Sequence, residues 1–282
     1  MTVEAASILG GRRATRRLAT QGQLTRTSGL GLGMALLWFS LLVLIPLAAV
    51  VATAADGGWT AFSDAITSEQ TAAAIRLTVG TALGVTVVNV LMGTLIAWVL
   101  VRDSFFGKRA LEVVIDIPFA LPTIVAGLVL LSLYGPTSPV GVDIANARPA
   151  VFVAFLFVTL PFVVRTVQPV LSELDRDVEE AAASLGAGRI TIFRRIILPS
   201  LLPAIFAGAA LSFARAVSEY GSLVLLSGNL PMRTEVTSVR ILSSIENDNL
   251  PGAAAVATIL LVISLVVIVL LDVIQRRMSR RG

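Results

Sequence analysis

Long apolar runs alternate with short polar segments along most of this chain. A hydrocarbon core about 30 Å thick takes about 20 helical residues at 1.5 Å per residue, and six runs reach that length. We expect helical spans at about 30–54, 75–101, 113–134, 149–170, 203–227 and 252–274. The pattern therefore predicts an all-α polytopic membrane protein with six transmembrane helices and a membrane domain over residues 30–275.

Basic residues gather at alternate ends of these spans. The two groups beside the chain termini are Arg12, Arg13, Arg16, Arg17 and Arg26, and Arg276, Arg277, Arg280 and Arg281. Cytoplasmic loops are enriched in Lys and Arg, so both termini are predicted to be cytoplasmic. Residues 1–29 and 276–282 then form two basic cytoplasmic tails. The exceptions to the rule are Arg76, Arg148, Arg233 and Arg240.

The N-terminus has a second interpretation. Paired arginines are typical of a twin-arginine signal, and Ala52-Thr53-Ala54 has the small residues of a cleavage site. The apolar run over 30–51 is longer than a signal-peptide core and long enough to cross a bilayer. We therefore interpret it as the first span.

Composition narrows the possible functions. The 282 residues are 56% hydrophobic and 14% charged, too apolar for a soluble domain. The sequence has no histidine and no cysteine, which excludes disulfides, thiolate metal sites and histidine chemistry. It also lacks the GxxxxGK[ST] phosphate loop, so we expect no ATP hydrolysis, no catalytic site, no metal and no cofactor on this chain.

One long polar segment, residues 171–202, separates the fourth and fifth spans and should lie in the cytoplasm. Its acidic residues come first and its arginines later, with Gly186 and Gly188 between them. Acids favour a helix N-terminus, and Gly186 sits where a left-handed C-cap is needed. We expect two short helices joined by a glycine turn.

This segment resembles the EAA loop of the permeases of ATP-binding-cassette (ABC) importers. Glu-Ala-Ala, three residues, Gly, nine residues and Ile-x-Leu-Pro are matched by Glu180, Ala181, Ala182, Gly186, Ile196, Leu198 and Pro199. The resemblance implies a type I permease fold and a coupling helix that docks on a separate ATPase subunit. The alternative is an ordinary amphipathic connector between two spans.

Two charges lie deep in the fifth predicted span. Arg215 and Glu219 are one turn apart on the same helix face, and each buried charge costs about 2.5–3.5 kcal/mol. They either neutralise each other in the packing, or line a hydrophilic pathway in which Arg215 contacts an oxyanion. We favour pathway lining without direct contact, with Ser218 and Tyr220 as further candidates.

Several other features have a prediction of their own. Asp116 should be an interfacial residue near the inner leaflet, and Arg165 should snorkel or pair with the acids that begin the EAA loop. Prolines 118, 122, 161 and 169 fit helices bent around a cavity. Apolar residues at every third position over 236–245 predict a short helix lying flat on the membrane.

Residues further along the chain resemble the permeases of one substrate class. The run from Arg215 to Gly221 is similar to that of sulfate and molybdate importer permeases, which usually have glycine where Ser218 stands. Segments 227–229 and 231–237 are similar to the T-type permease of sulfate and thiosulfate importers. A molybdate or tungstate permease remains an alternative, as does a self-contained secondary carrier or channel for anions.

The partners follow from this resemblance. It implies a second, W-type permease in a heterodimer, two ATPase subunits that bind ATP and Mg²⁺, and an extracytoplasmic sulfate-binding protein. It also implies the lipid bilayer of a bacterial plasma membrane, and no nucleic acid.

Overall fold

A computed structural model describes residues 26–279 of the chain. The predicted N-terminal tail thus lies almost entirely outside the described residues, and so do Arg280 and Arg281. The chain divides into two compact units, one ending at Ala49 and the other beginning at Val50.

The described part of the first unit is helical. It contains α1 (Arg26–Phe39), the π-helical turn η1 (Ser40–Leu44) and the start of α2 (Ile45–Asp56). The helical run Ser28–Asp56 has 29 residues, well beyond the apolar core of about 7–15 residues in a signal peptide. Its length fits a membrane span.

The wide turn η1 has a counterpart later in the chain, η2 (Phe193–Ile197). Each ends two residues before a proline, Pro46 for η1 and Pro199 for η2. Proline lacks an amide hydrogen, and its ring collides with the carbonyl one turn earlier. A π turn at that point widens the helix so that it continues past the proline.

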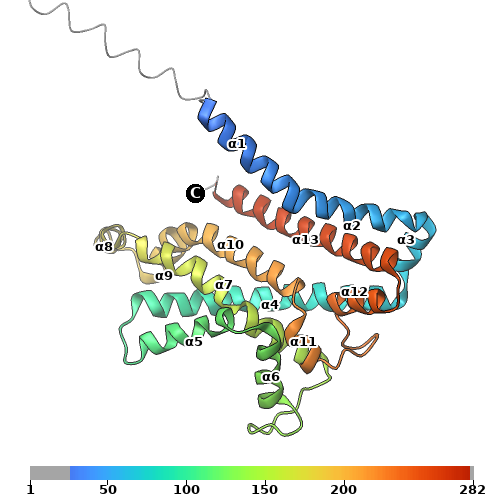
Figure 1. The fold of residues 1–282 in the computed structure, drawn as a ribbon. Coiled ribbons are helices and arrows are strands. Elements are labelled where there is room, and N and C mark those ends of the chain that lie inside the picture. The colour runs from blue at the N-terminus through green and yellow to red at the C-terminus, as the bar shows by residue number, and fades with distance from the viewer. Residues whose placement is uncertain (1–25, 280–282) are drawn as a thin grey trace, which may run out of the picture. The chain divides into compact units, whose positions relative to one another are not determined.

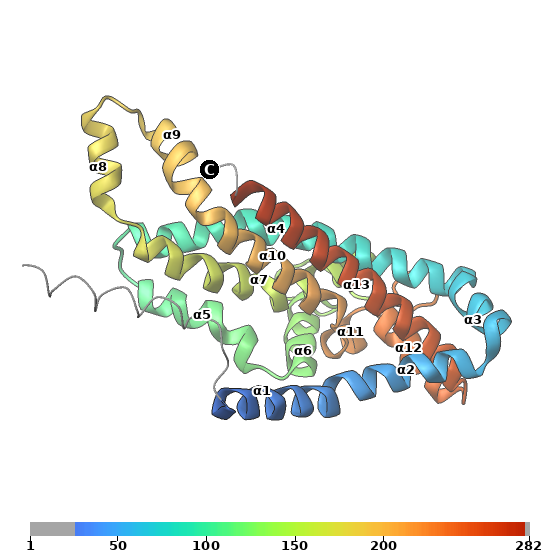
Figure 2. The ribbon, with the colours of Figure 1, turned by 90° about the horizontal axis from the view of Figure 1, so that it is seen from above.

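The second unit is built around three long helices, α4 (Glu69–Arg102), α7 (Arg148–Glu173) and α10 (Leu198–Val217). Helix α13 (Leu250–Ser279) packs against α10, with α12 (Thr237–Glu246) and α3 (Gly58–Thr67) beside it (Figures 1 and 2). Helix α12 lies where a short helix was expected over 236–245. The described residues contain no β-strand.

Small residues let these helices approach closely. Most buried positions of α4 are Ala, Gly or Thr, and a Cβ built on Gly93 would lie 2.8 Å from Cβ of Val163 in α7. Buried Asn89 of α4 donates hydrogen bonds to Thr159 Oγ1 of α7 (2.7 Å) and Ser212 Oγ of α10 (3.1 Å). Such contacts join helices in lipid, where apolar burial alone drives little association.

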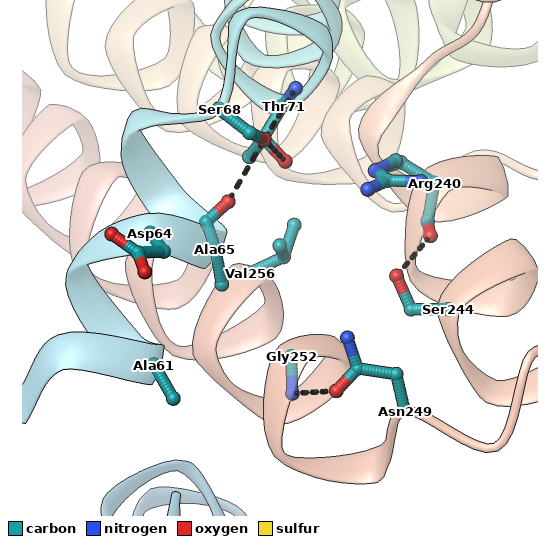
Figure 3. Close-up of a pocket in the computed structure, with 10 residues that line it drawn as sticks. All are labelled: Ala61, Asp64, Ala65, Ser68, Thr71, Arg240, Ser244, Asn249, Gly252 and Val256. Atoms are coloured by element: carbon teal, nitrogen blue, oxygen red, sulfur yellow. Dashed lines mark hydrogen bonds between the residues drawn. The ribbon is translucent and has the colours of Figure 1, made fainter. Parts of the chain in front are cut away.

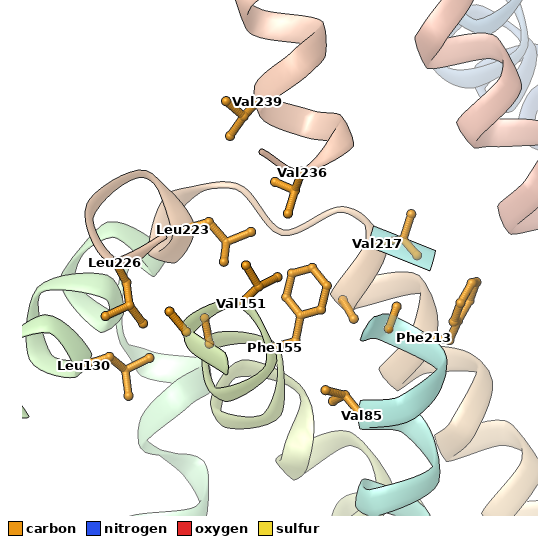
Figure 4. Close-up of a cluster of buried hydrophobic side chains, with 14 residues drawn as sticks. Val85, Leu130, Val151, Phe155, Phe213, Val217, Leu223, Leu226, Val236 and Val239 are labelled. Atoms are coloured by element: carbon orange, nitrogen blue, oxygen red, sulfur yellow. The ribbon is translucent and has the colours of Figure 1, made fainter. Parts of the chain in front are cut away.

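Two apolar clusters fill the interior of this unit. Phe155 and Phe213 are fully buried in the first, which joins α4, α7 and α10 to α11 (Gly221–Leu226) and α12 (Figure 4). The second cluster surrounds Leu100, Leu171 and Leu201, where α4 and α7 end and α10 begins. Both ends of the bundle therefore have a packed core.

The predicted third span, 113–134, is not one helix. The structure has α5 (Lys108–Ala120) and α6 (Thr123–Tyr134), bent by 117°. Leu121 is extended (φ −83°, ψ 133°), as expected for the residue before Pro122. The described residues thus contain five helices long and apolar enough to span a membrane, or six if this bent pair counts as one span.

The predicted fifth span, 203–227, is also interrupted. Helix α10 ends at Val217, residues 218–220 leave the helix, and α11 begins at Gly221. Helix α11 packs on α6, the other half-helix produced by a break. A Cβ built on Gly127 of α6 would lie 2.6 Å from the backbone oxygen of Ser222 and 2.8 Å from its Cα.

This close approach leads to a prediction. The Gly127→Ala substitution should destabilise the protein by about 1–3 kcal/mol, because backbone atoms of α11 must move to admit the methyl group. The control is Gly84→Ala in α4, whose added Cβ would meet only Phe152 Cε2, at an ordinary 3.6 Å. Thermal unfolding of both variants in detergent measures the difference, and equal melting temperatures would contradict the prediction.

Candidate functional site

The segment predicted to be a coupling loop forms two short helices around a turn. Helix α8 (Arg176–Ser184) is capped by Asp175, whose Oδ1 accepts a 2.9 Å hydrogen bond from the Asp177 amide. At its end the Gly186 amide donates to Ala183 O, and the Ala187 amide donates to Ala182 O. This pair of bonds is a Schellman motif, and Gly186 has the left-handed conformation it needs (φ +87°). The predicted glycine C-cap is confirmed.

Beyond the turn a single helical run leads away from the loop. Helix α9 (Arg189–Ile192) continues through η2 into α10, so Arg189–Val217 is 29 helical residues without a break. At the helical rise this run is about 44 Å long. It connects the loop directly to the break after Val217.

Helix α8 is anchored to the end of α4. Arg102 forms an ion pair with Glu179, and its guanidinium lies 5.4 Å from the ring centroid of Trp98. Trp98 in turn makes an edge-to-face contact with Phe193 of η2, with ring centroids 5.7 Å apart. These aromatic and charged contacts border a cavity of about 410 Å³, whose other lining residues are Arg189, Ile190, Ile192 and Ile197.

The seven motif residues divide between an outer and an inner face. Glu180 and Ala181 are exposed, and so is Pro199. Ala182, Ile196 and Leu198 pack against the second apolar cluster instead. The inward residues of the motif therefore attach the loop to the helix bundle, and the outward residues leave one surface of the loop exposed.

That free surface is unusually apolar for a polar segment. The exposed fractions of Val178, Leu185 and Ile190 are 51%, 90% and 75%. They lie on α8, on the turn and on α9, together with the exposed small residue Ala181. Exposed apolar side chains on one protrusion are typical of a surface that binds another protein.

The second predicted site lies at the break after α10, where Glu219 forms most of the polar contacts. This side chain is fully buried, and its Oε1 accepts hydrogen bonds from the Ser222 amide and from Ser222 Oγ, both 2.9 Å. Its Oε2 lies 2.7 Å from Nη2 of Arg215, within ion-pair distance but without the geometry of a hydrogen bond. The Glu219 backbone oxygen accepts from Ser238 Oγ of α12 at 2.8 Å.

The other candidates at this break are more accessible. The Arg215 side chain is 28% exposed, and Ser218 and Tyr220 are exposed. Ser218 Oγ donates to the Arg215 carbonyl at 3.1 Å. Arg215 and Glu219 thus form the ion pair of the first alternative, although Glu219 stands on a helix break and not on a continuous face, and pathway lining stays a prediction.

Arg165 has a different partner from the one expected. Its Nε and Nη2 form a bidentate pair with Asp116 of α5, at 2.7 and 2.5 Å. Nη1 donates to Gln168 Oε1 at 2.8 Å, and Nη2 also donates to the Glu112 carbonyl at 3.2 Å. The acids of the EAA loop are therefore not its partners, and Asp116 ties α5 to α7. Neither Arg102 nor Ser222 was singled out from the sequence as a member of a site.

At the end of the bundle remote from α8, a polar cavity of about 350 Å³ opens between α3, α12 and α13 (Figure 3). Ser68 Oγ donates to the Ala65 carbonyl, and the Gly252 amide donates to Asn249 Oδ1. Arg240 also lines it, and its carbonyl accepts from Ser244 Oγ. No cluster of three or more His, Cys, Asp or Glu side chains suited to a metal occurs within residues 26–279.

The sequence has clear relatives. The family model described as "Binding-protein-dependent transport system inner membrane component" matches residues 89–280. The chain is 40% identical over 259 residues to the sulfate transport system permease protein CysT of Salmonella typhimurium, covering 89% of this chain and 94% of that protein. It is 42% identical over 248 residues to the protein of the same name from Synechocystis, covering 86% and 87%.

The fold is also similar to that of solved transporters. A bacterial alginate ABC transporter, crystallised with an alginate pentasaccharide-bound periplasmic protein, matches with a TM-score of 0.74. The match covers 89% of this chain and 94% of that one at 18% identity. The MetNI methionine ABC transporter matches with a TM-score of 0.50 at 20% identity.

Proposed function

This chain belongs to the family of binding-protein-dependent transport system inner membrane components, and we propose that it is a permease subunit of an ATP-driven importer of sulfate and thiosulfate. The names of its relatives support the substrate class. As a member of this family with several apolar helices, the chain is a multi-pass integral membrane protein. Its membrane would be the bacterial cytoplasmic membrane.

The observation that carries the coupling mechanism is the helix Arg189–Val217. One end follows the exposed apolar loop, and the other ends at the break beside Glu219. Because the run stays helical through the π turn at η2 and through Pro199 and Pro203, no flexible linker separates the loop from the break, and a displacement of the loop can reach it. Helix α8, anchored through Arg102 and Glu179, would dock on the ATPase with Val178, Ala181 and Leu185.

The breaks in α5–α6 and α10–α11 support a pathway in this region. Irregular backbone at membrane depth is tolerated where it is buried in protein or lines a cavity. Buried Glu219 stabilises one break, and partly exposed Arg215 stands beside it. In the proposed cycle, ATP binding closes the ATPases, their motion tilts the long helix, and the half-helices shift to open the pathway outward.

The proposed complex has several further members. Two ATPase subunits would bind ATP and Mg²⁺ and hydrolyse the nucleotide, because this chain carries no phosphate loop of the GxxxxGK[ST] type. A second, W-type permease would complete the pathway as a heterodimer. An extracytoplasmic binding protein would deliver the anion, as the periplasmic protein bound to the alginate transporter suggests at a general level.

Uptake of radiolabelled sulfate in a deletion strain tests this proposal. Uptake should be lost on deletion and restored by the gene, and excess thiosulfate should compete with it. Unchanged sulfate uptake, together with lost molybdate uptake, would instead assign the chain to a molybdate or tungstate importer. Flux through the purified chain alone, without ATPase subunits, would indicate a secondary carrier.

A further inference from the structure

Three arginines that violate the charge rule of membrane topology come together in the structure. Arg76 of α4 and Arg148, the first residue of α7, line one cavity of about 390 Å³ with Leu77, Gly80 and Thr81 among its other residues. Arg148 and Arg233 line a neighbouring cavity of about 360 Å³ with Asn146 and Thr234. Arg148 is shared, so the two cavities form one arginine cluster: Arg76, Arg148 and Arg233.

None of these three arginines forms an ion pair within the described residues. The ion pairs found there are Arg102–Glu179, Arg165–Asp116, Arg215–Glu219 and Arg276–Asp272. Glu235, two residues after Arg233, is buried and accepts a 2.7 Å hydrogen bond from Gln70 Nε2. Asp143, the acid before Arg148 in sequence, accepts from the Ala145 amide at 3.0 Å.

The geometry also preorganises the cluster. Arg148 Nε donates a 3.2 Å hydrogen bond to the backbone oxygen of Arg233, which holds the guanidinium at the end of α7. Its two Nη groups take no part in that bond. All three side chains are exposed, so a small solute can reach them.

The arginine cluster lies at the end of the bundle remote from the coupling loop. Arg76 precedes Arg102, the residue that contacts α8, by 26 positions on the same helix. That separation is about 39 Å at the helical rise, enough to cross the hydrocarbon core. If the loop faces the cytoplasm, the cluster faces outward, where Lys and Arg are normally scarce.

We propose that Arg76, Arg148 and Arg233 form a receiving site for a tetrahedral oxyanion dianion, the sulfate class, on the outer face of the permease. This inference rests on the proposed function. Arginine presents a planar fork of donors that matches oxyanions, and it stays charged at any physiological pH. Three arginines without an ion-pair partner, around two cavities that share Arg148, would hold a dianion released beside the closed pathway and keep it from diffusing away.

The test uses the whole importer, with its binding protein, reconstituted in liposomes. The triple variant Arg76→Gln/Arg148→Gln/Arg233→Gln should lower the initial rate of sulfate uptake roughly tenfold, the lower end of what charge focusing does to association rates. The loss should be smaller at high ionic strength, because salt screens exposed charges. The triple Arg→Lys variant should recover most of the rate, since it restores the charge.

The matched control is Arg240→Gln, the same change at the same end of the bundle but in the separate cavity of Figure 3. It should leave uptake unchanged. Stimulation of ATP hydrolysis by the loaded binding protein should also be unchanged in the triple variant. Lost stimulation would mean that the cluster docks the binding protein, which overturns the proposal.

Two further outcomes also contradict it. If the loss disappears in liposomes of pure phosphatidylcholine, the ligand is the headgroup of an anionic lipid and not free sulfate. If the triple variant transports at the wild-type rate, the cluster has no role in capture, although the proposed function stands. Failure of the wild-type importer to take up sulfate would reject the proposed function itself.

Discussion

The Gly186→Val variant should lose most of its sulfate uptake and still insert into the membrane in normal amounts. Gly186 has φ +87°, and a Cβ added there would meet no atom within 4 Å. The effect is therefore conformational and not steric. A left-handed backbone costs a side-chain-bearing residue about 1–2 kcal/mol, and a β-branched residue should be at the upper end. The Schellman turn would open, and α8 would leave its docking position.

The comparison residue for this experiment is two positions away. Gly188 has an ordinary extended backbone (φ −70°, ψ 158°), and its Cβ would also meet no atom within 4 Å. Gly188→Val should transport normally, and Gly186→Asn should lie between the two, because asparagine tolerates the left-handed region.

Uptake and ATP hydrolysis are measured together for each variant. We expect uptake by Gly186→Val to fall at least about fivefold, a typical lower limit for the loss of a coupling energy. Hydrolysis should respond less to the loaded binding protein. Equal losses in both glycine variants would mean that transport needs a flexible segment and not this turn.

The structure of the predicted coupling loop could be read from the sequence because it is local. The glycine that ends the alanine-rich helix and the acids at the helix start each act on backbone groups within a few residues. Which side of α8 faces inward could not be predicted. The side that faces inward is set by Arg102 and Trp98 of α4 and by Phe193 of η2. All three residues belong to other elements than α8, so their contacts with it are tertiary.

The breaks in the third and fifth predicted spans, in contrast, could not be predicted from the sequence. Both 113–134 and 203–227 are long enough and apolar enough to be single spans, and the charges at Arg215 and Glu219 do not by themselves end a helix. Pro122 was a visible signal, but a proline in a membrane helix can also produce only a kink. The second break has no proline. It depends on Glu219 bonding to Ser222, a local contact between residues three apart, and on the close approach of Gly127 to α11, a tertiary contact.

The Glu219→Ala variant should be the most damaging substitution in the membrane domain. It removes the acceptor of both Ser222 bonds and leaves the Arg215 guanidinium without its carboxylate. Breaking a buried pair by removing one partner costs about 3–5 kcal/mol, and the partly exposed arginine places this case near the lower limit. We expect less protein in the membrane, a lower melting temperature in detergent, and little uptake. Wild-type amounts of stable Glu219→Ala protein would contradict this account of the break.

The double variant Arg215→Gln/Glu219→Gln decides what the pair does. Glutamine keeps an oxygen that Ser222 can donate to, and removing both charges leaves neither one unpaired. The double variant should therefore be about as stable as the wild type. If the pair served packing alone, uptake would return with stability. If Arg215 has the proposed pathway-lining role, stability should return and uptake should stay low, because a neutral amide cannot replace its positive charge.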